Sequence, residues 1–239
     1  MVERALVTGG ACGIGLAISQ SLLEAGIEVS ILDKVAPDLG GSCNFIEVDF
    51  EDEVRTIASL QEALQSGTIT RLVNNVGVVR PALLEDCTLE EYYSVMSVNV
   101  RAAILSSKAL LPGMREAEFG RIVNISSRTV LGKALRTNYS ASKGALVSLA
   151  RTWALELAGS GITANVVCPG PIRTELYNKA NPPDSPRTIA SLSNIPLGRM
   201  GEPSDIARAV MFFLDTSASF ITGQTLHVCG GTSVGRVDF

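Results

Sequence analysis

The stretch Thr8-Gly9-Gly10-Ala11-Cys12-Gly13-Ile14-Gly15 decides the fold class of this 239-residue chain. It follows the apolar run 4–8 and leads directly into a segment whose apolar residues recur at intervals of three and four, as in a helix. Glycines let a strand-to-helix turn approach a pyrophosphate closely, and the helix N-terminus offers unpaired N–H groups. The spacing Gly-x-x-x-Gly-x-Gly therefore indicates either a dinucleotide-binding turn or simply a tight connection.

Apolar runs rich in β-branched residues alternate with helical patterns along the rest of the chain. Most of these runs are continuous, as expected for a parallel sheet covered on both faces. The pattern predicts one domain over residues 1–239, a doubly wound (Rossmann) α/β fold with a seven-stranded parallel sheet and helices on both faces. The predicted strands are 4–8, 28–33, 44–49, 71–74, 120–126, 163–168 and 225–229. The predicted helices are 14–25, 52–65, 88–111, 138–158 and 203–214.

Composition excludes several classes of protein. The formal net charge of −4 argues against nucleic-acid binding, which usually needs a basic surface. No apolar run approaches the roughly 20 residues of a membrane-spanning helix, and the N-terminus does not resemble a secretory signal. Five cysteines without a Cys-x-x-Cys pair are typical of reduced thiols, so a cytoplasmic location is predicted. The single histidine, His227, excludes a multi-histidine zinc site, and no metal site is expected.

The end of the second predicted strand bears on the choice of cofactor. Asp33 lies 18 residues beyond Gly15, where an acid can bind the hydroxyls of an adenosine ribose and would repel a 2′-phosphate. This favours NAD over NADP, although the adjacent Lys34 could soften the preference. The long irregular segment 175–203 is predicted to be a substrate-binding lid.

A candidate proton-transfer pair lies in the second half of the chain. Tyr139 and Lys143 are four residues apart, on one face of a predicted helix. A nearby cation stabilises a phenolate and lowers the pKa of a tyrosine from about 10. Upstream, Ser126 and Ser127 end a predicted strand, where side chains of such a sheet point into the ligand crevice.

These motifs together resemble the short-chain dehydrogenase/reductase family, and most closely its 3-oxoacyl-reductase-like branch. The resemblance covers essentially the whole chain and rests on the order of six motifs. They are Thr8-Gly9-x-x-x-Gly13-x-Gly15, Asn74-Asn75-Val76-Gly77, Asn99, Ser126-Ser127, Tyr139-x-x-x-Lys143 and Pro169-Gly170. The family pattern commonly has alanine where Val76 stands, an apolar change that should not stop catalysis.

The resemblance implies hydride transfer between NAD(H) and a secondary alcohol/ketone substrate, usually in a homotetramer. Tyr139 would be the acid/base, Lys143 would lower its pKa and hold the nicotinamide ribose, and the backbone of Asn99 would bind a water. Ser127 would hydrogen-bond the substrate oxygen; strand-end alignment selects it, whereas the family's frequent spacing selects Ser126. The implied cofactor-binding residues are Gly9, Cys12, Gly13, Ile14, Gly15, Asp33, Asp49, Phe50, Asn75, Gly77, Tyr139, Lys143, Pro169, Gly170, Ile172 and Thr174.

Two other functions remain open at this point. One is an NADPH-dependent 3-oxoacyl-carrier-protein reductase, against which Asp33 argues. The other is a nucleotide-sensing or scaffold protein that has kept the fold and lost the reaction, against which the intact set of Ser, Tyr, Lys and Asn argues. Six basic residues flank the predicted crevice and are interpreted as scattered surface charge rather than as an anion site: Arg128, Lys133, Arg136, Arg173, Arg187 and Arg199.

Overall fold

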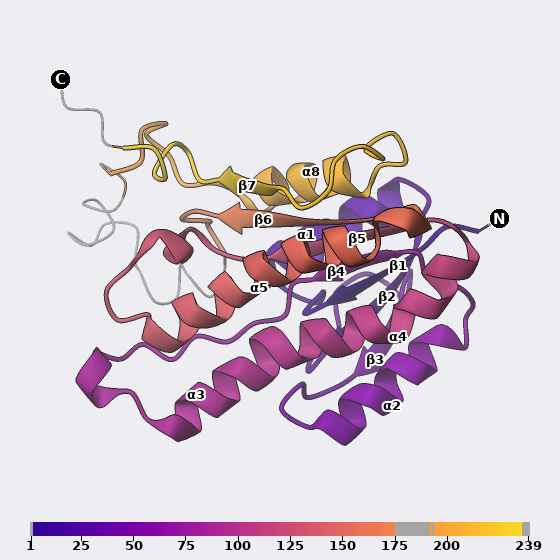
Figure 1. Ribbon diagram of the computed structural model, residues 1–239, viewed down its shortest axis with the longest axis horizontal. Coiled ribbons are helices and arrows are strands. Elements are labelled where there is room, and N and C mark those ends of the chain that lie inside the picture. The colour runs from indigo at the N-terminus through magenta and orange to yellow at the C-terminus, as the bar shows by residue number, and fades with distance from the viewer. Residues whose placement is uncertain (1, 175–191, 193, 236–239) are drawn as a thin grey trace.

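The computed structural model describes residues 2–174, 192 and 194–235, and it confirms the predicted sheet. Seven parallel strands are arranged in the order β3-β2-β1-β4-β5-β6-β7 (Figure 1). The strands are β1 (Arg4–Thr8), β2 (Glu28–Asp33), β3 (Asn44–Glu47), β4 (Arg71–Asn74), β5 (Gly120–Ile125), β6 (Ile162–Pro169) and β7 (Thr225–Val228). Most of their bounds differ by no more than two residues from those expected from the sequence.

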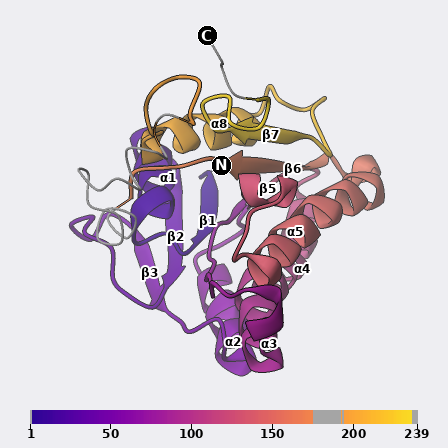
Figure 2. The ribbon, with the colours of Figure 1, turned by 90° about the vertical axis from the view of Figure 1, so that its left-hand side faces the viewer.

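Helices cover both faces of the sheet. Helices α1 and α8 pack together on one face, and α2, α4 and α5 lie on the other (Figure 2). The helices are α1 (Gly13–Glu24), α2 (Glu53–Leu64), α3 (Leu89–Met96), α4 (Ala102–Glu116), α5 (Thr137–Glu156) and α8 (Pro203–Leu214). Shorter turns are η1 (Leu84–Asp86), η2 (Ser97–Arg101), η3 (Arg128–Leu131) and η4 (Ala158–Ser160).

Alternating side chains of each strand supply two separate cores. On β1, Ala5 and Val7 pack into the core beneath α1 and α8, and Leu6 packs into the core beneath α2 and α4. All three side chains have no exposed surface, because successive residues of a strand face opposite sides of the sheet. The continuous apolar runs of the sequence therefore arise from burial on both faces.

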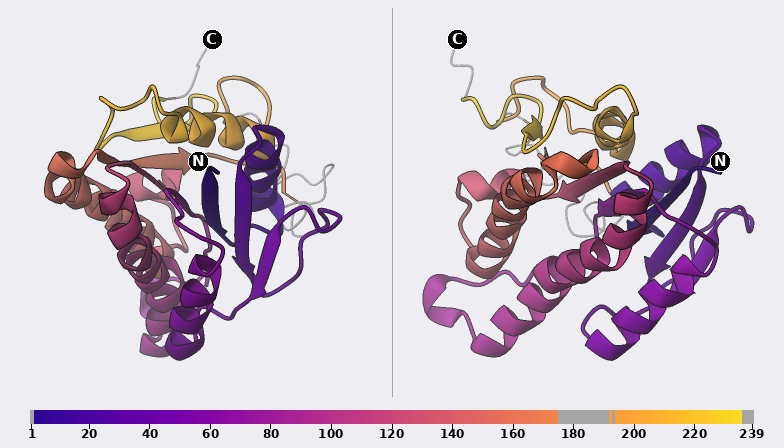
Figure 3. Two further views of the ribbon diagram at one scale, coloured as in Figure 1. Left: turned by 90° about the vertical axis from the view of Figure 1, so that its right-hand side faces the viewer. Right: turned by 45° about the vertical axis from the view of Figure 1, so that its right-hand side comes forward.

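The predicted helix 88–111 contains a π-helical turn and is not α-helical throughout. The structure divides it into α3 and α4, which are joined by the π-helical turn η2 and extend as one long rod beside α2 and α5 (Figure 3). Apolar periodicity does not distinguish an α-helical from a π-helical turn, and such turns often occur at functional sites. Here the turn contains Asn99, one of the candidate catalytic residues.

The connections place the site at the carboxyl ends of the strands. The chain runs outward from β1 to β3 and then returns to β4 on the other side of β1, so strand order reverses between β1 and β4. Ligands of open α/β sheets bind at such a reversal, outside the carboxyl ends of the strands. Of the predicted lid, residues 175–191 and 193 lie outside the described residues.

Candidate active site

The glycine-rich turn is held against the end of β4. The side-chain amide of Asn75 donates to the carbonyls of Thr8 (3.1 Å) and Gly9 (2.8 Å), and the Thr8 hydroxyl accepts from the N–H of Asn75 (3.0 Å). A Cβ on Gly9, which has φ +64°, would lie 2.9 Å from the Cα of Val76, and a Cβ on Gly15 would overlap the Gly9 carbonyl. The two backbones therefore pass too closely for any residue but glycine.

The N-terminus of α1 suits an anion. Cys12 is its N-cap residue but makes no side-chain capping hydrogen bond, and the first turn has no acidic side chain. Gly13, with φ +53°, brings the turn beside Thr174, where a Cβ would lie 3.4 Å from the threonine Cγ2. An uncapped helix end beneath a glycine turn fits the pyrophosphate of a dinucleotide cofactor.

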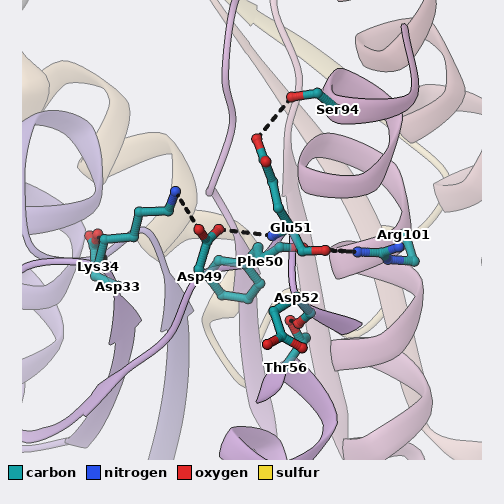
Figure 4. A network of polar contacts seen from close by, with 9 residues as sticks. All are labelled: Asp33, Lys34, Asp49, Phe50, Glu51, Asp52, Thr56, Ser94 and Arg101. Carbon is teal, nitrogen blue, oxygen red and sulfur yellow. Dashed lines mark hydrogen bonds and ion pairs between the residues drawn. The ribbon is translucent and has the colours of Figure 1, made fainter. Parts of the chain in front are cut away.

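Asp33 and Lys34 have different partners, and Figure 4 shows the contact between Lys34 and Asp49. Asp33 at the end of β2 accepts from the N–H of Ala11 through Oδ2 (3.0 Å), so it is held at the glycine turn. The Lys34 ammonium instead reaches Asp49, at 2.9 Å. This contact, together with the N–H of Glu51, lowers the pKa of the Asp49 carboxyl although partial burial opposes the change.

The segment after β3 is braced from the opposite side. Arg101 of the π-turn donates to the carbonyls of Phe50 (3.2 Å) and Glu51 (2.8 Å), and Ser94 donates to the Glu51 carboxylate (2.8 Å). The Phe50 side chain is only 2% exposed and packs in the core. The Phe50 ring is turned away from solvent, and a contact between Phe50 and the cofactor stays a prediction; the bracing by Arg101 was not predicted from the sequence.

The two candidate serines face different ways. The Ser126 hydroxyl is buried and donates to the Lys143 carbonyl at 2.7 Å. Ser127 is partly exposed, accepts from the N–H of Thr129 (3.2 Å) and lies beside the Tyr139 phenol, whose pKa it lowers. Of the two, Ser127 is therefore the one placed beside Tyr139, in agreement with the strand-end alignment.

Tyr139 and Lys143 lie together on α5, as the spacing predicts. The Lys143 ammonium is 5.7 Å from the centre of the Tyr139 ring, is 3% exposed as a residue, and donates to the Ile125 carbonyl at 2.8 Å. Burial lowers the pKa of Lys143 to about 8. Burial raises the pKa of Tyr139 above 10, outweighing Ser127 and the charge of Arg136, which both lower it. The expected depression of the Tyr139 pKa is therefore absent here.

The Asn99 side chain connects α5, which carries this pair, to the loop after β4. Its side chain accepts from the N–H of Val78 (2.8 Å) and donates to the Val78 carbonyl (3.1 Å) and to the Ser142 hydroxyl (2.9 Å). A Cβ on the intervening Gly77 would lie 3.1 Å from the Lys143 ammonium. The π-turn thus ties the loop after β4 to α5. The role of Ser142 as a hydrogen-bond partner of Asn99 was not predicted, because a serine inside a helix has no distinguishing sequence signal.

A cleft of about 470 Å³ brings most of the candidate residues together. Its lining includes ten of those predicted: Ile14, Asn75, Gly77, Ser127, Tyr139, Lys143, Pro169, Gly170, Ile172 and Thr174. It also includes Arg128, Lys133 and Arg136, which the sequence analysis interpreted as surface charge. The other candidates form the glycine turn (Gly9, Cys12, Gly13, Gly15), the β2–β3 edge (Asp33, Asp49, Phe50) and the support behind Lys143 (Asn99).

Exchanging each serine for alanine separates their roles. Ser127→Ala is expected to lower kcat for ketone reduction by at least about tenfold, because a hydrogen bond to a charged oxygen contributes about 1.5–3 kcal/mol. Ser126→Ala is expected to leave kcat unchanged and to lower the free energy of unfolding by about 1 kcal/mol through loss of a buried hydrogen bond. Steady-state kinetics and urea unfolding of both variants are the measurements. The reverse pattern would reassign the role to Ser126.

This fold and site define an oxidoreductase that uses a nicotinamide dinucleotide: a dinucleotide turn lies beside a Tyr–Lys–Ser set at the switch point of a doubly wound sheet. Residues 9–233 match a family model described as enoyl-(acyl carrier protein) reductase. The chain belongs to the short-chain dehydrogenase/reductase family and resembles its 3-oxoacyl-reductase-like branch. It transfers a hydride between a nicotinamide cofactor and an alcohol/ketone pair.

Individual relatives agree with this assignment. The chain is 38% identical to a 3-oxoacyl-[acyl-carrier-protein] reductase FabG of Vibrio harveyi, over 95% of this chain and 96% of the relative. It is 37% identical to an acetoacetyl-CoA reductase of Shinella zoogloeoides, over 97% and 98% of the two chains. The ligand-free aldohexose dehydrogenase of Thermoplasma acidophilum superposes with a TM-score of 0.90 at 31% identity, covering 100% of this chain and 96% of that one.

Proposed function

We propose that this protein is an NAD(H)-preferring dehydrogenase/reductase of a secondary alcohol/ketone pair, with Tyr139 as its acid/base. The observation that carries the cofactor preference is the position of the Asp33 carboxylate, held at the glycine turn by the N–H of Ala11. A carboxylate there accepts the ribose hydroxyls of NAD and repels the 2′-phosphate of NADP. The Lys34 ammonium, the nearby cation that could offset this repulsion, is bound by Asp49.

The chain's own residues would handle the proton. When bound, the nicotinamide supplies or accepts the hydride. Tyr139 and Ser127 would hold the substrate oxygen, and this would fix the position of the carbonyl carbon in the cleft. A phenol with an ordinary pKa of about 10 is protonated at neutral pH, and burial raises the pKa of Tyr139 further, so the phenol is ready to donate to a ketone oxygen. Lys143, with a pKa of about 8, is then mostly charged and would stabilise the phenolate that forms.

The alternative is an NADPH-dependent 3-oxoacyl-carrier-protein reductase. Its substrate class is favoured by relatives named 3-oxoacyl-[acyl-carrier-protein] reductase FabG, among them those of Vibrio harveyi and Thermotoga maritima, at 38% and 35% identity. Asp33 and the Lys34–Asp49 contact argue against NADPH. Comparing the dissociation constants of NADH and NADPH decides between these readings, since the alternative requires tighter binding of NADPH.

Replacing Asp33 by serine tests the cofactor preference. Asp33→Ser should weaken NADH binding and strengthen NADPH binding, shifting the ratio of their dissociation constants by about tenfold to hundredfold, or about 1.4–2.8 kcal/mol. The reason is that one change removes both a ribose acceptor and a repelling charge. Fluorescence titration of each reduced cofactor measures the ratio. The matched control, Asp86→Ser, removes an exposed carboxylate of η1 and should leave the ratio unchanged. An unchanged ratio in Asp33→Ser would remove Asp33 from the cofactor site.

The remaining expectations concern assembly and location. We expect a homotetramer, supported by exposed apolar side chains on two faces of the molecule. Leu155 of α5 is 83% exposed and Ile104 of α4 is 41% exposed, and Phe212 of α8 and Phe220 before β7 are also exposed. Within the part of the chain that the structure describes, no helix is long and apolar enough to cross a membrane, and no group of three potential metal ligands occurs. The single domain with a lid at 175–203, the cytoplasmic location and the absence of nucleic-acid partners stay predictions.

A further inference from the structure

The cleft beside Tyr139 has an unbalanced charge. Among the described residues that line it, Arg128, Lys133, Arg136 and Lys143 are basic, and none is an aspartate or a glutamate. The whole chain, by contrast, has a net charge of −4. Lys143 is buried and belongs to the proposed proton-transfer pair, so three further cations line the cleft.

Other arginines near the cleft are neutralised by acidic partners. Arg173 lies 3.5 Å from Glu202, and Arg199 lies 2.8 Å from Asp205. Both carboxylates belong to the start of α8. In the described part of the chain, neither Arg128 nor Arg136 forms an ion pair with a carboxylate. Among the described residues, the arginines near α8 are thus paired with carboxylates, whereas Arg128 and Arg136 are not.

Arg128 and Arg136 are placed at both ends of one short segment. Arg128 follows Ser127 directly and begins η3, and Arg136 is the N-cap residue of α5, three residues before Tyr139. Both side chains are partly buried. The Arg136 guanidinium donates a hydrogen bond to the Leu135 carbonyl (2.8 Å), and its positive charge lowers the pKa of the Tyr139 phenol. Ser127 and Tyr139 thus each lie within three residues of an arginine that lines the same cleft.

We propose that Arg128 and Arg136 bind an anionic group of the substrate, so that the preferred alcohol or ketone carries a carboxylate, sulfonate or phosphate. This inference rests on the proposed function and adds the substrate class to it. A guanidinium matches the geometry of these anions with two parallel hydrogen bonds, and partial burial strengthens the contact relative to water. The anion can belong to a small keto acid or to the phosphates of an acyl thioester carrier.

Matched ketones that differ only in charge provide the kinetic test. Acetoacetate and its neutral ethyl ester present the same reducible carbonyl, and acetoacetyl-CoA presents it on a phosphate-bearing carrier. In the double variant Arg128→Gln/Arg136→Gln, kcat/KM for the anionic substrate should fall by about tenfold to hundredfold, mainly through KM, and that for the ester should change by less than about twofold. A large loss with acetoacetate identifies a small acid, and a loss confined to the CoA thioester identifies the carrier.

A binding measurement separates this inference from catalysis. With NADH bound, 3-hydroxybutyrate cannot react, so its binding is followed by NADH fluorescence without turnover. Wild type should bind it and the double variant should bind it at least about tenfold more weakly, with an unchanged dissociation constant for NADH. Arg173→Gln, which removes a nearby cation that is already paired, is the control and should bind both as wild type does.

Three results would overturn the assignment. Equal losses of kcat/KM for acetoacetate and for its ethyl ester would mean that the arginines shape the cleft without recognising the charge of the substrate. Weaker NADH binding in the double variant would place the arginines on the cofactor phosphates instead. Wild-type binding of 3-hydroxybutyrate by the double variant would exclude an anion subsite for small acids, and an unchanged KM for acetoacetyl-CoA would exclude it for the carrier. If no ketone is reduced but 3-hydroxybutyrate binding depends on the arginines, the proposed function fails and the subsite stands.

Discussion

Replacing Tyr139 with phenylalanine is expected to lower kcat for ketone reduction by about 10²–10⁴-fold, the usual contribution of a positioned general acid. The variant keeps the ring on α5 and removes only the hydroxyl that lies beside Ser127. Lys143, whose ammonium lies 5.7 Å from the ring centre, keeps its contact with the Ile125 carbonyl and has no phenolate left to stabilise. The effect should therefore fall on kcat, measured under saturating NADH, with the NADH dissociation constant nearly unchanged.

Tyr92→Phe is the matched control. Tyr92 lies on α3, is 37% exposed and contacts Tyr93 through its ring, so removing its hydroxyl should change neither kcat nor cofactor binding. Near wild-type turnover in Tyr139→Phe would refute the acid/base assignment. A loss of NADH binding that accounts for the whole effect would instead make Tyr139 a cofactor-binding residue.

Gly15→Ala is expected to weaken cofactor binding and to destabilise the fold. The new Cβ would overlap the Gly9 carbonyl and lie 2.6 Å from the side-chain nitrogen of Asn75, so the turn and α1 must separate. Overpacking of this kind costs about 1–3 kcal/mol. Because the same backbone would cradle the pyrophosphate, the NADH dissociation constant should rise by at least about tenfold. Fluorescence titration and urea unfolding give the two quantities.

Gly159→Ala provides the comparison. Gly159 lies in η4, and a Cβ there would meet no atom within 4 Å. Its variant should unfold within about 0.5 kcal/mol of wild type, as surface substitutions usually do, and should bind NADH normally. Equal NADH affinity in Gly15→Ala and wild type would show that the glycine turn does not contact the cofactor.

Local patterns were sufficient to predict the order and type of the elements. Continuous apolar runs marked strands buried on both faces, and the glycines of the turn from β1 into α1 predicted a dinucleotide site, because glycine is needed where two backbones nearly touch. The same patterns did not reveal the π-turn at Asn99. Its hydrogen bonds join Val78 and Ser142, which are 21 and 43 residues away in sequence, and no local signal reports such pairs.

Residue types at short, regular spacing were sufficient to predict the doubly wound fold, the glycine turn, the Tyr139–Lys143 pair and the acid at Asp33. The folded structure was needed to show that Ser127, rather than Ser126, lies beside Tyr139. It also decided that Lys34 is bound to Asp49 and that Arg128 and Arg136 line the cleft. Burial also raises the pKa of Tyr139, although Ser127 and Arg136 both lower it. The physical reason is common to all four: solvation and partner choice depend on groups that lie far apart in the chain and meet only after the sheet has formed.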